Sequence, residues 1–268
     1  MATSTPTTAQ RLKALALAHK RTIIVAVCAI VFLALLEDVL EGGLMAFDRS
    51  AWTLITTPTG YDEVLTAIAQ QVSGIATPVA LLVMLLIIVA FAPGSRPGLC
   101  CAINLVCVCA LNVILKDLVQ RPRPDFSLLG RAVETGYSFP SGHSMVAMAF
   151  FGLLVWLVWR YERNRTMSLA CCAGFSLIIL LIGLSRIYLG VHYASDVLAG
   201  FCVSLAWLAV YTSVVAPLLL KDPGRPRGTL KTAAASMAEG TSPDAEGETP
   251  ATTAEAPNAE GEAEAPKA

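Results

Sequence analysis

The chain has 268 residues, of which 55% are apolar and 15% are charged, and its mean hydropathy is +0.64. Soluble domains are about 25% charged, so this chain has too few charged residues to cover a water-facing surface. The net charge of -1 divides unevenly, because residues 1–231 carry six excess basic side chains and residues 232–268 seven excess acidic ones. These numbers exclude a neutral globule, a wholly disordered chain and a nucleic-acid binder with one dominant basic face.

Six apolar runs that carry almost no charge follow one another along the chain. A hydrocarbon core of about 30 Å needs roughly 20 helical residues, and backbone groups in lipid must be bonded within their own segment. The runs are residues 22–36 (extendable to 40), 73–92, 97–115, 144–159, 166–185 and 197–220. We therefore predict an all-α fold, an integral membrane bundle of six transmembrane helices over residues 22–220.

The two ends of the chain differ from this bundle. Lys20 and Arg21 precede the first run as in a signal peptide, but no small-x-small cleavage pattern follows directly, so we interpret the run as the first spanning helix. Residues 1–21 are then an N-terminal segment. Residues 221–268 are rich in Ala, Glu, Thr, Pro and Gly and lack aromatic residues, which predicts a disordered acidic tail, either a solvated tail or a functional tether.

Basic residues between the runs predict the orientation, because cytoplasmic loops of membrane proteins are enriched in Lys and Arg. If the N-terminus is cytoplasmic, the inside segments hold 12 Lys and Arg residues and the outside segments hold six. Both termini are then cytoplasmic, and the loops 41–72 and 116–143 face outward. Loop 41–72 mixes apolar and polar residues, which suits short helices in the outer interface that act as a simple connector or as a lateral gate for a lipid.

Polar side chains gather at three places near the expected outer ends of the helices. Charged groups at membrane depth are costly, so such clusters are candidate sites. The clusters run from Lys116 to Pro124, from Pro140 to His143 and from Ser185 to Asp196. The end of the third helix, the start of the fourth and the junction of the fifth and sixth lie on one membrane face. We expect the three clusters to form a single site.

A phosphate ligand gives each residue type in these clusters a chemical task. Three cations, Lys116, Arg123 and Arg186, match phosphate oxygens. Ser141 and Gly142 open a helix, whose free N–H groups and positive dipole end attract an anion. His192 and Asp196 are four residues apart, a spacing that lets the carboxylate hold the imidazole in the nucleophilic tautomer. His143 is then the expected proton donor to the leaving oxygen.

Simpler roles remain open for several of these residues. Ser141 could be only a helix cap, and Asp196 could only stabilise the start of a helix. Arg49, Arg121 and Arg131 stand near helix ends and are expected to extend toward lipid headgroups. The eight cysteines lie inside apolar runs, where we expect them to pack as small hydrophobic residues, with no metal site and no disulfide framework.

The three clusters resemble the signature of the type 2 phosphatidic acid phosphatase and haloperoxidase superfamily. The matching patterns are K-x6-R-P from Lys116 to Pro124, P-S-G-H from Pro140 to His143 and S-R-x5-H-x3-D from Ser185 to Asp196. The resemblance implies a membrane lipid phosphatase that needs no cofactor or metal. It implies that a phosphohistidine forms on His192.

The substrate implied is a lipid phosphate or diphosphate in the membrane, with no nucleic acid as partner. The leading candidates are an isoprenoid carrier diphosphate such as undecaprenyl diphosphate, and phosphatidic acid or phosphatidylglycerol phosphate. Two other functions remain open. A non-enzymatic lipid transporter or scaffold could use the same six-helix frame. A vanadate-dependent haloperoxidase shares the signature, but the related oxidative enzymes are soluble, and the six apolar spans argue against it. The sequence leaves the oligomeric state open.

Overall fold

The computed structural model describes residues 19–42, 46–57, 62–91, 96–124 and 135–220, all within one compact unit. The predicted N-terminal segment, except its last three residues, and the predicted acidic tail lie outside the described residues, as does Arg131. Every regular element in the described ranges is an α-helix, which confirms the predicted fold class. The helices are α2 (Lys20–Leu40), α3 (Ala46–Thr56), α4 (Glu63–Gly74), α5 (Pro78–Phe91), α6 (Arg96–Val119), α7 (Gly142–Tyr161), α8 (Arg165–Tyr188) and α9 (Ala194–Leu219).

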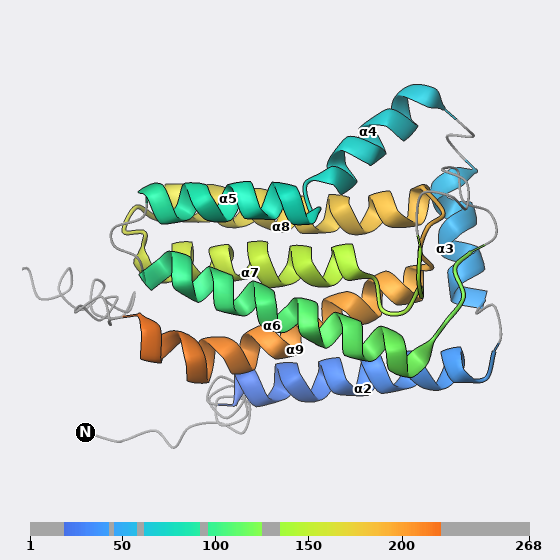
Figure 1. Cartoon of the computed structure of the whole chain (residues 1–268), viewed down its shortest axis with the longest axis horizontal. Helices are drawn as coiled ribbons and strands as arrows, with labels where there is room; N and C mark the ends of the chain where they lie inside the picture. The colour runs from blue at the N-terminus through green and yellow to red at the C-terminus, as the bar shows by residue number, and fades with distance from the viewer. Residues whose placement is uncertain (1–18, 43–45, 58–61, 92–95, 125–134, 221–268) are drawn as a thin grey trace, which may run out of the picture. The chain divides into compact units, whose positions relative to one another are not determined.

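Five of these helices are long and apolar enough to span a membrane, namely α2, α6, α7, α8 and α9. They run side by side in Figure 1, with α7 packed against both α8 and α9, and α2 packed against α9. Large apolar side chains stay exposed on the outside, among them Val79, Leu86, Val106 and Val214. Such exposure is expected where lipid rather than water surrounds the bundle.

The second predicted span differs from the expectation of one straight helix over residues 73–92. Helices α4 and α5 meet at a 51° bend, and they make a sixth candidate span only if they are counted together. Pro78 begins α5, and because proline has no backbone N–H it cannot continue the hydrogen-bond ladder of α4. Thr77 stabilises the new start, since its Oγ1 accepts from the N–H of Ala80 at 3.5 Å.

Helix α3 lies within the connector 41–72, together with most of α4, so the prediction of short helices there is confirmed. Helix α3 packs against α8 and α9, and α4 packs against α8. Figure 1 shows α3 beside the end of the bundle where α8 passes into α9. This placement brings part of the connector to the end that carries the sequence clusters.

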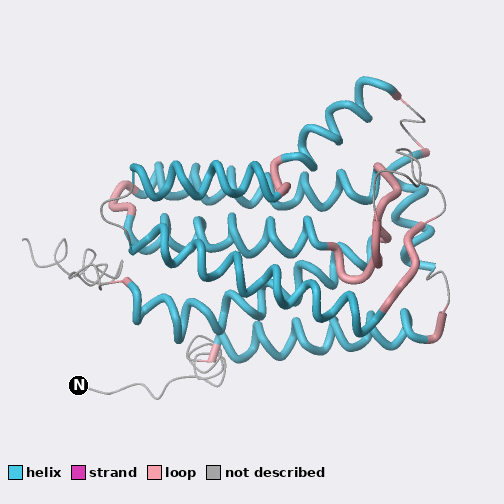
Figure 2. The backbone as a smooth tube through the Cα atoms, in the orientation of Figure 1, coloured by secondary structure: helices cyan, strands magenta, loops and turns pink. Residues whose placement is uncertain are grey.

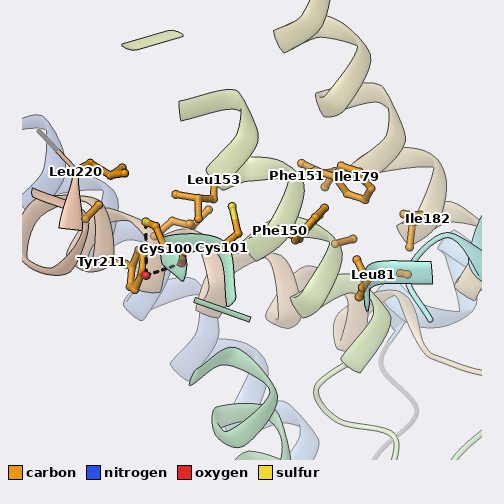
Figure 3. Close-up of a cluster of buried hydrophobic side chains, with 14 residues drawn as sticks. Leu81, Cys100, Cys101, Phe150, Phe151, Leu153, Ile179, Ile182, Tyr211 and Leu220 are labelled. Carbon is orange, nitrogen blue, oxygen red and sulfur yellow. Dashed lines mark hydrogen bonds between the residues drawn. The ribbon is translucent and has the colours of Figure 1, made fainter. Parts of the chain in front are cut away.

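Aromatic and aliphatic side chains fill the interior around α7, as Figure 3 shows for Phe150, Phe151 and Leu153. Buried polar groups join neighbouring helices through this core. The Tyr211 hydroxyl of α9 donates to the carbonyl of Cys100 on α6 at 2.7 Å. Bonds of this kind fix the positions of neighbouring helices relative to one another.

Asn104 links three helices at once, and its loss is expected to destabilise the bundle. Its Nδ2 donates to the carbonyl of Ala149 at 2.8 Å, and its Oδ1 accepts from the Trp207 indole N–H at 2.9 Å. Interhelical hydrogen bonds in membranes contribute about 1–2 kcal/mol at most. We expect Asn104→Ala to lower the free energy of unfolding in mixed detergent by about that amount, while Cys109→Ala on the exposed side of α6 leaves it unchanged.

Candidate active site

The three sequence clusters lie at one end of the bundle. Figure 2 shows the loops after α6 and before α7 running beside the α8–α9 junction at that end. Two backbone bonds join them, because the Ser138 N–H donates to the carbonyl of Arg121 at 2.8 Å and the Ser141 N–H to that of Asp196 at 3.0 Å. The predicted convergence is therefore present in the structure.

The first cluster lies where the chain turns abruptly at the end of α6. Helix α6 ends at Val119, and Gln120 has a φ of 53°, in the left-handed region. The Lys116 ammonium in the last turn of α6 donates to the carbonyl of Tyr137 at 2.7 Å. The Arg123 guanidinium donates to the carbonyls of Gly136 and Val191 at 3.1 and 2.9 Å. These two cations tie the loop before α7 to the end of α6.

Arg121 contradicts the expectation that it extends toward lipid headgroups. Its guanidinium is buried and forms ion pairs with Asp196 at 2.6 Å and with Asp48 at 2.9 Å. It also lies over the ring of Tyr193, 4.0 Å from the ring centre. A guanidinium between two buried carboxylates compensates charges that would otherwise be costly to bury. This pairing explains why the Arg121 side chain points into the protein and not toward the headgroups. Arg49, by contrast, is exposed.

The second cluster forms the start of α7. Ser141 is the N-cap, and its Oγ accepts from the Ser144 N–H at 3.5 Å and from the Ser144 hydroxyl at 3.0 Å. Gly142 follows in close contact with α6, because a Cβ there would lie 3.0 Å from Oδ1 of Asn112. His143 stands half-buried in the first turn. Gly200 of α9 lets this start approach, since its own Cβ would lie 3.0 Å from the Ser141 carbonyl oxygen.

The third cluster spans the junction of α8 and α9. Arg186, in the last turn of α8, is buried and donates to the hydroxyl of Ser73 on α4 at 2.6 Å. His192 lies in the connecting loop, and Asp196 lies in the first turn of α9, both buried. Asp196 also accepts from the Tyr193 N–H at 2.9 Å, so it caps the start of α9 as well as facing the imidazole.

The partners of His192 determine its tautomer. Nδ1 is 3.4 Å from Oδ2 of Asp196, and Nε2 is 3.3 Å from NH1 of Arg123. An ionised carboxylate only accepts hydrogen bonds and a guanidinium only donates them. Nδ1 therefore carries the proton, and Nε2 keeps its lone pair directed at Arg123. This is the tautomer that a histidine nucleophile requires.

Burial and positive charge lower the pKa of His192 to about 4, against an ordinary value of 6.5. Removal from water is the largest cause, and the charges of Arg186 and Arg123 act in the same direction, while the hydrogen bond and charge of Asp196 oppose them. The imidazole is thus neutral throughout the physiological pH range. The same effect makes protonation below pH 6.5 favour the unfolded chain.

Sequence reasoning missed Ser138, Asp48 and Ser195, which contact Asp196, its chain neighbour or its partner Arg121. Ser138 donates its hydroxyl to Oδ2 of Asp196. Asp48 of α3 accepts from the N–H and the hydroxyl of Ser195, each at 2.7 Å. Ser138 and Asp48 belong to no sequence motif, so nothing in their local sequence indicates a site.

The predicted site residues are connected to one another in different ways. Arg123, His192 and Asp196 form one continuous series of side-chain hydrogen bonds. Ser141 joins them through its backbone. The positive charge of Arg186 acts on His192, although its described hydrogen bond reaches α4. Lys116, Gly142 and His143 border this series from the end of α6 and the start of α7.

A separate groove of about 610 Å³ lies among α2, α7, α8 and α9. Trp156, Trp159 and Leu205 line it, and Lys20 and Arg21 border it. None of the eight predicted site residues is among its lining residues. The groove therefore belongs to a different part of the bundle from the polar cluster.

Residues 97–218 match the family model described as the PAP2 superfamily, which confirms the resemblance seen in the motifs. A 99-residue segment is 39% identical to phosphatidylglycerophosphatase B of Bacillus subtilis, covering 35% of this chain and 46% of that protein. Another, of 110 residues, is 34% identical to lipid A 1-phosphatase of Rhizobium johnstonii, covering 38% and 41%. The chain thus spans less than half the length of these curated relatives.

A solved structure shares the architecture. It is the crystal structure of a transmembrane PAP2 type phosphatidylglycerolphosphate phosphatase from Bacillus subtilis, with a TM-score of 0.60 and 26% identity. The similarity covers 70% of this chain and 94% of that chain. Together with the apolar helices, it identifies this chain as a multi-pass membrane protein.

The low pKa of His192 can be measured directly, because the chain has only three histidines. We expect nitrogen-edited NMR of the histidine-labelled protein in detergent to show one imidazole that stays neutral until about pH 4. The signal is assigned by its disappearance in His192→Ala. An imidazole at position 192 that titrates near 6.5 would contradict the buried, positively charged environment.

Proposed function

We propose that this chain, whose residues 97–218 match the PAP2 superfamily, is an integral membrane phosphatase that releases phosphate from a lipid phosphate monoester or diphosphate. One observation carries the proposal. The His192 imidazole lies between an acceptor on Nδ1 and a cationic donor on Nε2. The lone pair on Nε2 thus points toward Arg123, the cation that we expect to hold the phosphoryl group.

The first chemical step transfers the phosphoryl group to the enzyme. When the substrate binds, Arg123 directs its N–H groups to phosphoryl oxygens, and Nε2 of His192 attacks phosphorus. The P–N bond forms as the P–O bond to the leaving group breaks, and His143 gives its proton to the departing oxygen. The leaving group is the lipid alcohol of a monoester or the lipid monophosphate of a diphosphate. Asp196 stabilises the imidazole as it becomes positively charged, through the proton on Nδ1.

The second step returns the enzyme to its starting state. Neutral His143 accepts a proton from water as the water oxygen attacks phosphorus. The P–N bond breaks, its electron pair returns to Nε2, and inorganic phosphate leaves.

Positive charge and backbone donors stabilise the phosphoryl oxygens in both steps. Lys116, Arg123 and Arg186 supply the cations, and Arg is suited to hold two oxygens at once. The start of α7 at Ser141 and Gly142 offers free N–H groups and the positive end of the helix dipole. These groups act without a metal ion in our proposal, as electrostatic stabilisation aimed at the transferring group.

Membrane lipids supply the substrate in this proposal. An isoprenoid carrier diphosphate and phosphatidic acid or phosphatidylglycerol phosphate share the required chemistry, a phosphoryl group on an apolar chain. The names of the two relatives, phosphatidylglycerophosphatase B and lipid A 1-phosphatase, support a lipid-borne phosphate.

The decisive assay measures phosphate release from these lipids by purified protein in detergent with a chelator of divalent metals. We expect release by the parent protein and a loss of roughly 10³-fold or more in His192→Ala, because the nucleophile is gone. Cys109→Ala, an exposed position on α6, serves as the matched control. Full activity in His192→Ala would refute the nucleophile assignment.

The same preparation separates the alternative functions. Halide oxidation after addition of vanadate and peroxide, without phosphate release, would favour a haloperoxidase. Lipid binding or movement without any phosphate release would favour a transporter or scaffold.

We further propose that the site faces outward and that both termini are cytoplasmic, on the distribution of Lys and Arg. Thr135 precedes α7 at the site end, and Arg163 lies exposed in the turn between α7 and α8. A membrane-impermeant maleimide is expected to label Thr135→Cys in intact cells, but Arg163→Cys only after permeabilisation. The reverse pattern would invert the topology.

A further inference from the structure

A carboxylate outside all three motifs is buried beside the proposed site. Asp48 lies in the first turn of α3 and is 2% exposed. Burying a charged carboxylate is costly unless it is paired and hydrogen-bonded. Its position in the connector before α4 does not require burial, because neighbouring residues of α3 are exposed.

Asp48 receives three hydrogen bonds from two segments of the site. Its Oδ1 accepts from the Ser195 N–H at 2.7 Å, and its Oδ2 accepts from the Ser195 hydroxyl at 2.7 Å. The same Oδ2 accepts from NH2 of Arg121 at 2.9 Å. Asp48 therefore holds both the residue directly before Asp196 and the cation that contacts Asp196.

The guanidinium of Arg121 is divided between the two carboxylates. NH1 donates to Oδ1 of Asp196 at 2.6 Å and to the Ser195 hydroxyl oxygen at 2.8 Å, and NH2 donates to Asp48. This division leaves Oδ2 of Asp196 to face Ser138, the Tyr193 N–H and Nδ1 of His192. Guanidinium and carboxylate groups commonly pair through two parallel hydrogen bonds. Without Asp48, NH2 can turn to Oδ2 of Asp196 and compete with His192 for that oxygen.

We propose that Asp48 is a positioning residue, which holds Arg121 and the start of α9 so that Asp196 directs Oδ2 at His192. Through Asp48, helix α3 takes part in aligning His192. The kinetic consequence rests on the proposed phosphatase function, whereas the effect on His192 does not.

Asp48→Asn is the primary test. Asparagine has the size of aspartate, but its side chain has one acceptor oxygen and an NH₂ group that only donates. Three donors point at Asp48, so asparagine cannot satisfy all of them. We expect kcat for phosphate release to fall by about 10- to 100-fold, because small misalignments of reacting groups reduce the rate by such factors. KM should stay within about twofold, because Asp48 contacts no group assigned to the phosphate.

Asp62→Asn is the matched control. Asp62 lies in the same connector and caps α4 through the Leu65 N–H at 2.7 Å, a role that asparagine also fills. We expect it to leave kcat, KM and the His192 titration as in the parent. Ser195→Ala is a milder second variant that keeps the backbone bond to Asp48, and we expect it to lower kcat in the same direction but less.

The titration of His192 distinguishes positioning from a loss of folded protein. The hydrogen bond that Nδ1 of His192 donates to Asp196 raises the pKa of His192 against burial, so loosening that bond lowers the pKa below the parent value of about 4. We expect this shift in Asp48→Asn, and a smaller one in Ser195→Ala. A structural role alone would reduce the folded fraction and leave the pKa of the folded molecules unchanged.

The outcomes separate this inference from the proposed function. A parent that releases no phosphate from any lipid refutes the function, while the His192 titration still tests Asp48. An active parent whose Asp48→Asn variant matches it in both kcat and the His192 pKa overturns the positioning role. If Asp48→Asn does not fold, an unchanged kcat and His192 pKa in Ser195→Ala overturn it instead.

Discussion

The buried carboxylate of Asp196 is the constraint on which this end of the molecule depends. It accepts hydrogen bonds from Ser138, His192, the Tyr193 N–H and Arg121. A charge this deep is tolerated only when such donors surround it. They come from the segment after α6, the loop before α7 and the α8–α9 junction, so satisfying one carboxylate requires three parts of the chain to converge.

Much of this arrangement was predictable from local patterns. Long apolar runs predicted α2, α6, α7, α8 and α9, because a helix is the only open structure that satisfies its own backbone in lipid. The positions of the clusters at helix ends predicted one shared face. The four-residue spacing of His192 and Asp196 predicted their contact on one helix face. The contact is present, although His192 lies in the loop just before α9 begins at Ala194.

The rest depended on contacts between segments distant in sequence. Asp48 is 73 residues from Arg121 and 147 from Ser195, so nothing beside it indicates burial. Without those partners it resembles any acid in a first helical turn. Arg121 was misjudged for the same reason, because an arginine after a membrane helix extends to headgroups unless a carboxylate lies inside. The bend before Pro78 was not predicted, because Pro78 lies within one continuous apolar run that was interpreted as a single helix.

Arg121 and Arg123 are each followed by a proline, which favours a common direction for their side chains. A residue before proline is disfavoured in the helical region, so Arg121 and Arg123 are both driven toward extended backbone. Alternate residues of an extended chain point to the same side. Arg121 and Arg123 therefore both reach the α8–α9 junction, where Arg121 meets the carboxylate of Asp196 and Arg123 meets the imidazole of His192. A helix continuing past Val119 would separate their directions by about 200°, and one of the two contacts would be lost.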